Sequence, residues 1–470
     1  MAVPTKRACE EADSSNILSK LSTVSKDETK LQNFLSWSEE NGLWLSPKVC
    51  VTKQGSCAQY GMLATDSVDC GECLFKVPRK LLLHPKTSAI SKLLRKEEAS
   101  LVSESGWVPL LLALMYEHNS PESTWRPYLD LVPDFKELDL PMFWPESERA
   151  SLLDSANGIL KCVERDIKSL TAEFTTIVLP FVQKHKDVFG SACESLELYK
   201  KMVAFVMAYS FTEPTGDDED EQMKGDVPSK SAPMMVPMGD ILNHVAHNNA
   251  ELRFEKEFLK MVSTAKIAKD EEVFNTYGML SNKDELHMYG FSERYPNNDK
   301  DTVDIPATVL KEEAKSQDIN QADKTLLEEK WEFLMEQEVI GEDDAFVLSN
   351  EAIETCDELE ATLKVLEMTR SEFEDYQEKD GWSEDEGDEE DDSEEKWMFV
   401  PNGIPKQKDS WKKLLKGCAE KCLAMYKTSL EEDEECLATG LDKLSPRQKY
   451  VLYTNHGQKL ILQKLLDSCS

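Results

Sequence analysis

The sequence has little positive charge. Its 54 lysines and arginines are outnumbered by 90 aspartates and glutamates, which leaves a formal net charge of −36 at pH 7. Because a protein needs a basic surface to bind a phosphate backbone, this shortage argues against DNA or RNA as a direct ligand. It favours positively charged partners, such as lysine-bearing segments of other proteins.

Long apolar runs and a disulfide framework are also missing. No run approaches the roughly 18 apolar residues of a membrane helix, so we expect a soluble protein that does not insert into membranes. The twelve cysteines are scattered along the chain, and no apolar N-terminal segment would direct it to an oxidising compartment. We therefore expect reduced thiols, in the nucleus or the cytosol. Acidic residues at positions 10, 11 and 13 argue against an organelle transit peptide, which is poor in acids.

Three short segments carry the chemistry. Residues 58–62 read Ala-Gln-Tyr-Gly-Met, residues 240–244 read Asp-Ile-Leu-Asn-His, and residues 274–278 read Phe-Asn-Thr-Tyr-Gly. Together they resemble the core of the SET-domain protein methyltransferases. Their order, with a long insertion after the glycine turn, resembles the subclass typified by the Rubisco large-subunit methyltransferase. Further similar strings lie at residues 105–110, 125–128, 142–145 and 207–211.

The resemblance implies S-adenosyl-L-methionine as the cofactor and Tyr277 as the catalytic residue. The cofactor contacts that it implies are Ala58, Gln59, Tyr60, Tyr209, Asn243, His244 and Tyr289. The substrate contacts that it implies are Trp107, Thr212 and Tyr277. Two of these residues have a simpler interpretation. Tyr289 can pack beneath the site, and a tryptophan at the start of an apolar helix, as at position 107, is often a core residue.

Elementary chemistry limits what Tyr277 can do. A phenol with a pKa near 10 is a poor general base at pH 7, so we expect the hydroxyl to orient and stabilise the reacting groups. A lysine must lose its proton before it attacks, which costs roughly 4 to 5 kcal/mol at pH 7. A nearby sulfonium charge and the loss of water lower the pKa of the amine. Alignment can contribute roughly 7 to 11 kcal/mol, so geometry should dominate.

The fold class that we expect is α+β. The resemblance implies a pseudoknotted, β-rich SET core that is split by a helical insertion and followed by an all-α substrate-binding domain. Such threading is an exception to the usual rules of chain topology. The expected ranges are a flexible N-terminus at 1–29, the first part of SET at 30–85, the insertion at 86–210, the second part of SET at 211–300 with a mobile acidic loop at 213–233, and the helical domain at 305–470 with a disordered acidic tract at 378–396.

Patterns near the C-terminus give more local predictions. Ser445, Pro446 and Gln448 form the signature of a helix start, in which the serine caps and the glutamine closes a capping box. Cys418 and Cys422 recur among apolar residues at helical spacing, so we expect both thiols in the core.

A metal-dependent hydrolase is one alternative. Asp240, His244 and His247 would share one face if residues 240–247 were helical. That interpretation leaves the Tyr-Gly pair unexplained. Cys70 and Cys73 supply only two of the four ligands of a structural zinc site. We therefore predict no metal.

Two further alternatives keep the SET scaffold. One is a non-catalytic acidic module that binds basic proteins, although such a module should have lost Tyr277 or the Asn-His pair. The other is a protein-histidine methyltransferase, because a sibling branch of the subclass methylates histidine. The resemblance is strongest to a nuclear branch and implies RelA-like transcription regulators and histones as partners. It places the protein in the nucleus, and also in the cytoplasm, and leaves its oligomeric state and degree of methylation open.

Overall fold

The computed structural model describes most of the chain, and the described residues are 26–132, 135, 138–153, 156, 158–214, 232–316, 321–341, 343–378, 397–399, 404 and 407–469. Nearly all of the predicted acidic loop at 213–233 and of the predicted acidic tract at 378–396 lies outside them, as do residues 1–25. Their predicted mobility therefore stays a prediction. Helix α1 (Lys26–Glu40) begins inside the expected flexible N-terminus, because its apolar face already packs on the core.

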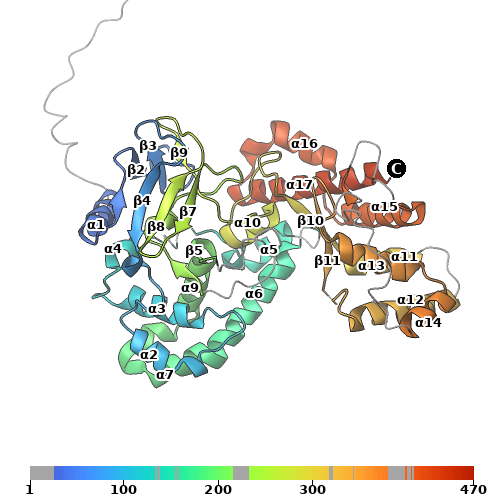
Figure 1. Cartoon of the computed structure of the whole chain (residues 1–470), viewed down its shortest axis with the longest axis horizontal. Coiled ribbons are helices and arrows are strands. Elements are labelled where there is room, and N and C mark those ends of the chain that lie inside the picture. The colour runs from blue at the N-terminus through green and yellow to red at the C-terminus, as the bar shows by residue number, and fades with distance from the viewer. Residues whose placement is uncertain are drawn as a thin grey trace, which may run out of the picture.

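Two small antiparallel sheets carry the strands of the SET core (Figure 1). One has the strand order β1-β4-β8-β7, and the other has the order β2-β3-β9. Strand β4, from the start of this region, pairs with β8 from its end, and β3 pairs likewise with β9. The strands are β1 (Trp44–Leu45), β2 (Val49–Thr52), β3 (Gly61–Ala64), β4 (Cys73–Pro78), β7 (Ala250–Phe254), β8 (Phe258–Ser263) and β9 (Glu272–Val273), with β5 (Ser210–Phe211) paired separately to β6 (Met234–Met235).

The named elements between β4 and β5 are all helices, joined by turns and loops, as predicted for the insertion. Helix α3 (Val108–Asn119) is apolar on all sides and buries every residue from Leu110 to Met115, because it packs inside the main core against α9. The elements of this segment are η1 (Arg79–Leu81), α2 (Ser91–Lys96), η2 (Glu98–Ser100), α3, α4 (Arg126–Leu129), η3 (Pro141–Phe143), α5 (Glu146–Leu152), α6 (Ile159–Glu173), η4 (Phe174–Val178), α7 (Leu179–Lys184), α8 (Lys186–Phe189), η5 (Ser191–Glu194) and α9 (Leu196–Tyr209).

Helix α10 (Asn282–Tyr289) follows the Tyr-Gly segment and has well-defined ends. Ser281 caps its start in a capping box with Asp284. Gly290 ends it with a left-handed φ of 80°. A Cβ at Gly290 would lie 2.8 Å from the backbone oxygen of Asp139, so the turn has room only for glycine. These two ends fix where Tyr289 lies.

The C-terminal region has its own apolar core and is mainly helical, as predicted (Figure 1). It also contains a two-stranded sheet that the sequence patterns did not indicate, β10 (Thr302–Pro306) paired with β11 (Ala345–Ser349). The capping box of Ser445 with Gln448 and the burial of Cys418 and Cys422 are confirmed. The helical elements are α11 (Ala307–Ser316), α12 (Gln321–Glu336), α13 (Cys356–Glu367), α14 (Arg370–Glu378), α15 (Asp409–Ala424), α16 (Leu430–Thr439), η8 (Leu441–Lys443) and α17 (Pro446–Ser468).

Helix α17 joins the two regions. It packs on α15 and α16 on one side and on α10 of the SET core on another. Within the described residues, no helix is long and apolar enough to span a membrane.

Candidate active site

The structure brings the Asn-His and Tyr-Gly segments together. The backbone N–H of Asn275 donates to the carbonyl of Asn243 at 2.9 Å, and His244 and Asn275 form a parallel bridge. The backbone N–H of Tyr277 donates to Nδ1 of His244 at 3.0 Å, and the Tyr277 hydroxyl donates to the carbonyl of Leu242 at 2.8 Å. Tyr277 is therefore held at both its backbone and its hydroxyl.

Aromatic rings enclose Tyr277. Its ring stacks on Tyr289, with centroids 4.8 Å apart, and on the imidazole of His244, with centroids 5.1 Å apart. Phe291 completes the group, 6.2 Å from the ring centroid of His244. Tyr209 comes from the end of α9 and packs edge-on against Phe205.

Burial keeps the Tyr277 hydroxyl protonated. Loss of water raises its pKa well above the ordinary value of 10, and the nearby phenols of Tyr209 and Tyr289 raise it further. The proton that remains is the one donated to Leu242. The Tyr277 oxygen can therefore accept and orient, but it is unsuited to act as a base near pH 7.

The side chain of Asn243 joins the glycine turn to the Asn-His segment. Its Nδ2 donates to the carbonyl of Tyr60 at 3.0 Å, to Oγ of Ser56 at 3.0 Å and to Oε1 of Glu272 at 2.6 Å. Glu272 also accepts from the Ser56 hydroxyl at 3.0 Å and from the backbone N–H of Cys57 at 2.8 Å. One carboxylate and one amide thus fix the turn against the rest of the site.

The glycine turn is packed tightly on its inner side. A Cβ at Gly61 would lie within 3.0 Å of Ser56 and Glu272 side-chain atoms, so a larger residue would push the turn away from Asn243. On the outer side, Ala58 is exposed and Gln59 is half-buried. Their backbone groups are therefore accessible to a ligand.

Two predicted substrate residues lie outside this arrangement. Trp107 is half-buried at the start of α3 and packs against the main core. Thr212 is exposed just after β5. Within the described part of the chain, neither makes a hydrogen bond or ring contact with Tyr277. Their substrate roles stay predictions.

The helical face proposed for a metal site does not form. The short helix η6 (Gly239–Ile241) ends before His244, and His247 is exposed. The carboxylate of Asp240 instead accepts a hydrogen bond from the hydroxyl of Tyr128 in the buried core. Burial raises the pKa of Asp240 to about 8.

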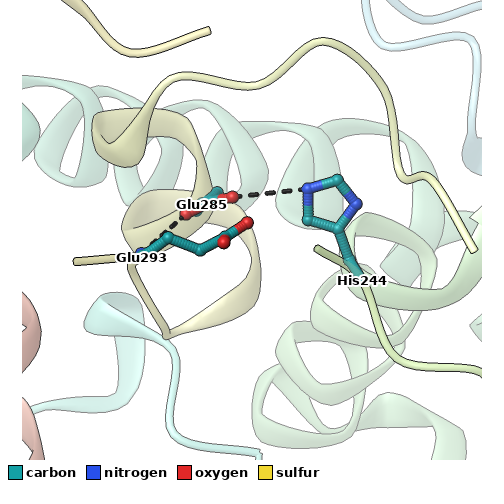
Figure 2. Close-up of side chains that lie close together, drawn as sticks. All are labelled: His244, Glu285 and Glu293. Carbon is teal, nitrogen blue, oxygen red and sulfur yellow. Dashed lines mark hydrogen bonds and ion pairs between the residues drawn. The ribbon is translucent and has the colours of Figure 1, made fainter. Parts of the chain in front are cut away.

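A different cluster lies beneath Tyr277. Figure 2 shows His244 facing Glu285 and Glu293, and their nearest side-chain atoms all lie within 4.8 Å of one another. Nε2 of His244 is 3.3 Å from Oε1 of Glu285. Burial and the charge of Glu293 raise the pKa of Glu285 to about 8, and burial lowers the pKa of His244.

Sequence patterns did not single out Glu272, Glu285 or Glu293. One signal was available for Glu285, because it lies one helical turn before Tyr289 and directly beside the fully buried Leu286. A charged residue at a position expected to face the core is unusual and deserves a functional hypothesis.

Comparison with known proteins agrees with this geometry. The SET domain family matches residues 59–278, and the Rubisco LSMT substrate-binding family matches residues 321–462. The N-lysine methyltransferase SETD6 of Rattus norvegicus is 46% identical, over 93% of this chain and 90% of its own length. SETD6 of Homo sapiens is 42% identical, over 93% of this chain and 95% of its own length.

Solved structures give the same fold. A crystal structure of the SET domain of LSMT bound to lysine and AdoHcy superposes with a TM-score of 0.65 at 18% identity, covering 94% of this chain and 91% of that one. Rubisco LSMT bound to AdoMet superposes with a TM-score of 0.63, also at 18% identity, covering 93% and 90%.

The fold and the site together define a SET-domain protein methyltransferase with a Rubisco LSMT-type substrate-binding domain. The chain belongs to the family of N-lysine methyltransferases represented by SETD6. S-adenosyl-L-methionine is its cofactor, as the sequence resemblance implied.

Proposed function

We propose that this protein transfers a methyl group from S-adenosyl-L-methionine to the ε-amine of lysines in other proteins, with Tyr277 as the catalytic residue. One observation carries the role of Tyr277. Its backbone N–H and its hydroxyl are both fixed by residues of the Asn-His segment, within a buried aromatic group. Such fixation is what a transfer reaction that depends on alignment requires.

The residues around the glycine turn fit the cofactor. The Nδ2 of Asn243 is already used by the protein, while its amide oxygen has no partner among the described residues and can accept from an ammonium group. Ala58, Gln59 and Tyr60 would contribute backbone groups, and Tyr209, His244 and Tyr289 would line the same space. When bound, the cofactor supplies a methyl group activated by a positively charged sulfur.

The chain's own residues would then orient the lysine amine and exclude water from it. Tyr277 presents its oxygen to the reacting groups while its O–H keeps donating to the carbonyl of Leu242. The stacked rings of Tyr277 and Tyr289 exclude water, which lowers the pKa of an incoming lysine and favours its neutral, attacking form. Trp107 and Thr212 are proposed to contact the substrate outside this enclosed part.

For partners, we propose RelA-like transcription regulators and histones, reached in the nucleus and also in the cytoplasm. The support is electrostatic. A chain with a net charge of −36 attracts basic segments and speeds their encounter, more strongly at low salt. Imaging of a tagged full chain in cells would test the location, and exclusion from the nucleus would contradict it.

A methylation assay with labelled cofactor tests the activity. Wild type should modify a RelA-like fragment or histones, and mass spectrometry should place the methyl groups on lysine. Asn243→Ala should weaken cofactor binding measured by calorimetry, because it removes the amide that holds both the turn and the cofactor. Methylation of histidine only, or full activity in both Asn243→Ala and Tyr277→Phe, would overturn the proposal.

A further inference from the structure

The carboxyl cluster beneath Tyr277 has no part in the chemistry described above. Helix α10 places Glu285, which is fully buried, 3.3 Å from Nε2 of His244 (Figure 2). The other oxygen of Glu285 accepts the backbone N–H of Glu293 at 3.1 Å. Glu293 in turn accepts the backbone N–H of Ala246 at 2.6 Å. The cluster therefore contacts the imidazole of His244 and the backbone two residues after it.

A buried cluster of this kind should lower the stability of the folded chain. A carboxyl group taken out of water costs free energy unless hydrogen bonds replace the lost hydration. Oε1 of Glu285 faces His244 without a well-aligned hydrogen bond in the described structure. A leucine of similar size would pack there without that cost. The arrangement points to a role in controlling His244.

The imidazole of His244 has a task that depends on where its proton lies. Its Nδ1 accepts the backbone N–H of Tyr277 at 3.0 Å, so that nitrogen must keep its lone pair. In a neutral imidazole, the proton must then be on Nε2, the nitrogen that faces Glu285. If the proton moved to Nδ1, two N–H groups would face each other and the contact to Tyr277 would be lost.

The same reasoning argues against a cation at the cluster. A metal ion would need the lone pair of Nε2, which is available only if the proton moves to Nδ1 or leaves the ring. Either the hydrogen bond to Tyr277 or the neutral state of the imidazole would be given up. The geometry suits a hydrogen-bond donor on Nε2 and an acceptor oxygen on Glu285.

We propose that Glu285 is a positioning residue: by holding an acceptor oxygen 3.3 Å from Nε2 of His244 it favours the imidazole tautomer that holds the backbone of Tyr277 in place for methyl transfer. Glu293 supports it by donating its backbone N–H and by lying beside the same carboxyl. This inference rests on the proposed function for its effect on catalysis. Its effect on the state of His244 is independent of that function.

The raised pKa of Glu285, about 8, defines a matched pair of variants. Because the carboxyl is largely neutral at pH 7, Glu285→Gln should keep a neutral side chain of the same shape with an oxygen towards His244. The backbone N–H of Glu293 retains a second acceptor, Oδ1 of Asn282 at 3.3 Å. Glu285→Leu keeps the volume but removes the acceptor.

The experiment combines kinetics with nitrogen NMR of ¹⁵N-histidine in the full chain. Glu285→Leu should lower kcat about 10- to 100-fold, as expected when a reacting group is misplaced by up to an ångström. Its KM for the lysine substrate and its cofactor affinity should stay close to wild type. Glu285→Gln should restore most of kcat. His244, assigned by its loss in His244→Asn, should show the Nε2–H tautomer in wild type and Glu285→Gln, and a tautomer mixture in Glu285→Leu.

Several outcomes would overturn the inference. An Nδ1–H tautomer in wild type would do so even if Glu285→Leu fails to fold, because that measurement needs no variant of Glu285. Wild-type kcat in folded Glu285→Leu, or equal damage by leucine and glutamine, would do so as well. Zn²⁺ that shifts the His244 signals at stoichiometric concentration would favour a cation site. An inactive wild type with the Nε2–H tautomer would instead count against the proposed function.

Discussion

The active-site region and the C-terminal core bury different kinds of side chain. Around Tyr277, the buried groups include carboxyls, and Glu272 hydrogen-bonds to Ser56 across 216 positions of sequence. In the C-terminal region most buried side chains are apolar, and Trp397 stacks on Trp411 with 7° between the ring planes, although Lys459 and Asp433 form a buried ion pair at 2.6 Å. Directional bonds fix positions to a fraction of an ångström, whereas apolar packing mainly supplies stability. We infer that the active-site region depends on precise geometry, whereas the C-terminal core mainly supplies stability.

The contact of α17 with Asn282, Ser292 and Asp301, called the seam below, joins the two regions and is polar. Asn282 at the start of α10 donates its backbone and side-chain N–H groups to Asp301 at 3.0 and 2.9 Å. Thr454 of α17 donates to the hydroxyl of Ser292 at 3.1 Å. Gly457 of α17 lies directly against Asp301. The docking of α17 is therefore specified by hydrogen bonds that leave no space for an extra methyl group.

Trp411→Ala should cause the largest change and should be confined to stability. Removing a buried tryptophan costs about 3 to 5 kcal/mol in the free energy of unfolding. The kcat for a short lysine peptide should stay near wild type below the melting temperature, because the Tyr277 contacts lie in the other core. Denaturant unfolding and steady-state kinetics would measure both. Met398→Ala, at a side chain that is 41% exposed, is the control. A large fall in kcat with unchanged stability would contradict this separation of stability from catalysis.

Tyr277→Phe should have the opposite effect. Loss of the hydroxyl that we propose to orient the reacting groups should lower kcat about 100-fold, equivalent to roughly 2.7 kcal/mol of transition-state stabilisation. The free energy of unfolding should fall by only about 1 kcal/mol, the usual value of one hydrogen bond. Tyr453→Phe, at a half-buried tyrosine of α17, provides the matched control. A kcat within about threefold of wild type would contradict a catalytic role for Tyr277.

Gly457→Ala tests the seam. The new Cβ would lie within 3.0 Å of the Asp301 carboxylate, which is itself held by Asn282. Overpacking of this kind costs about 1 to 3 kcal/mol, and we expect the loss in thermal unfolding of the whole chain. Gln463→Ala, on the same helix and away from the seam, should stay within about 0.5 kcal/mol. Equal effects of the two substitutions would show that the seam tolerates repacking.

A last expected effect is a pH dependence of stability that comes from the buried carboxyls of the polar region. Asp240 and Glu285 have folded pKa values of about 8, and Asp301 of about 7, all raised by burial. Each group binds its proton more tightly when folded, so its contribution to stability is present at low pH and is lost as pH rises through the folded pKa. Between pH 7 and 8 the free energy of unfolding should fall by about 1 kcal/mol for Asp240, about 1 kcal/mol for Glu285 and a few tenths for Asp301, or about 2 kcal/mol together.

Asp301→Asn offers the corresponding test of that dependence. The amide cannot ionise, so the fall between pH 7 and 8 should become smaller. Titration of His244 should not obscure the measurement, because burial lowers the pKa of this imidazole and the ring is already neutral above pH 7. Stability that rises over this interval would mean that the buried carboxyls are ionised in the folded protein.

Sequence patterns could predict the features that depend on residues a few positions apart. Asn243, His244 and Tyr277 stand in short motifs, and the structure places their segments side by side. The start of α17 follows from Ser445 and Gln448 alone. These features depend on residues a few positions apart, so periodicity and capping rules apply to them directly.

The carboxyls that organise the site could not be predicted in this way. Glu272 and Glu285 are two of 90 acidic residues, and only Glu285 has a local signal, its place among the core-facing positions of a helix. Their partners, Ser56 and His244, are fixed only once distant segments meet. The pairing of β10 with β11 was missed for a related reason, because two strands of five residues separated by two helices leave a weak alternation.

The pairing of β4 with β8 and of β3 with β9 also has a consequence for synthesis. As the chain leaves the ribosome, the first strands of the SET core emerge long before their partners. Unpaired strand edges are then exposed until Val273 has cleared the exit tunnel. Chaperone dependence of this chain in the cell should therefore end when β9 appears, well before the C-terminal helices are made.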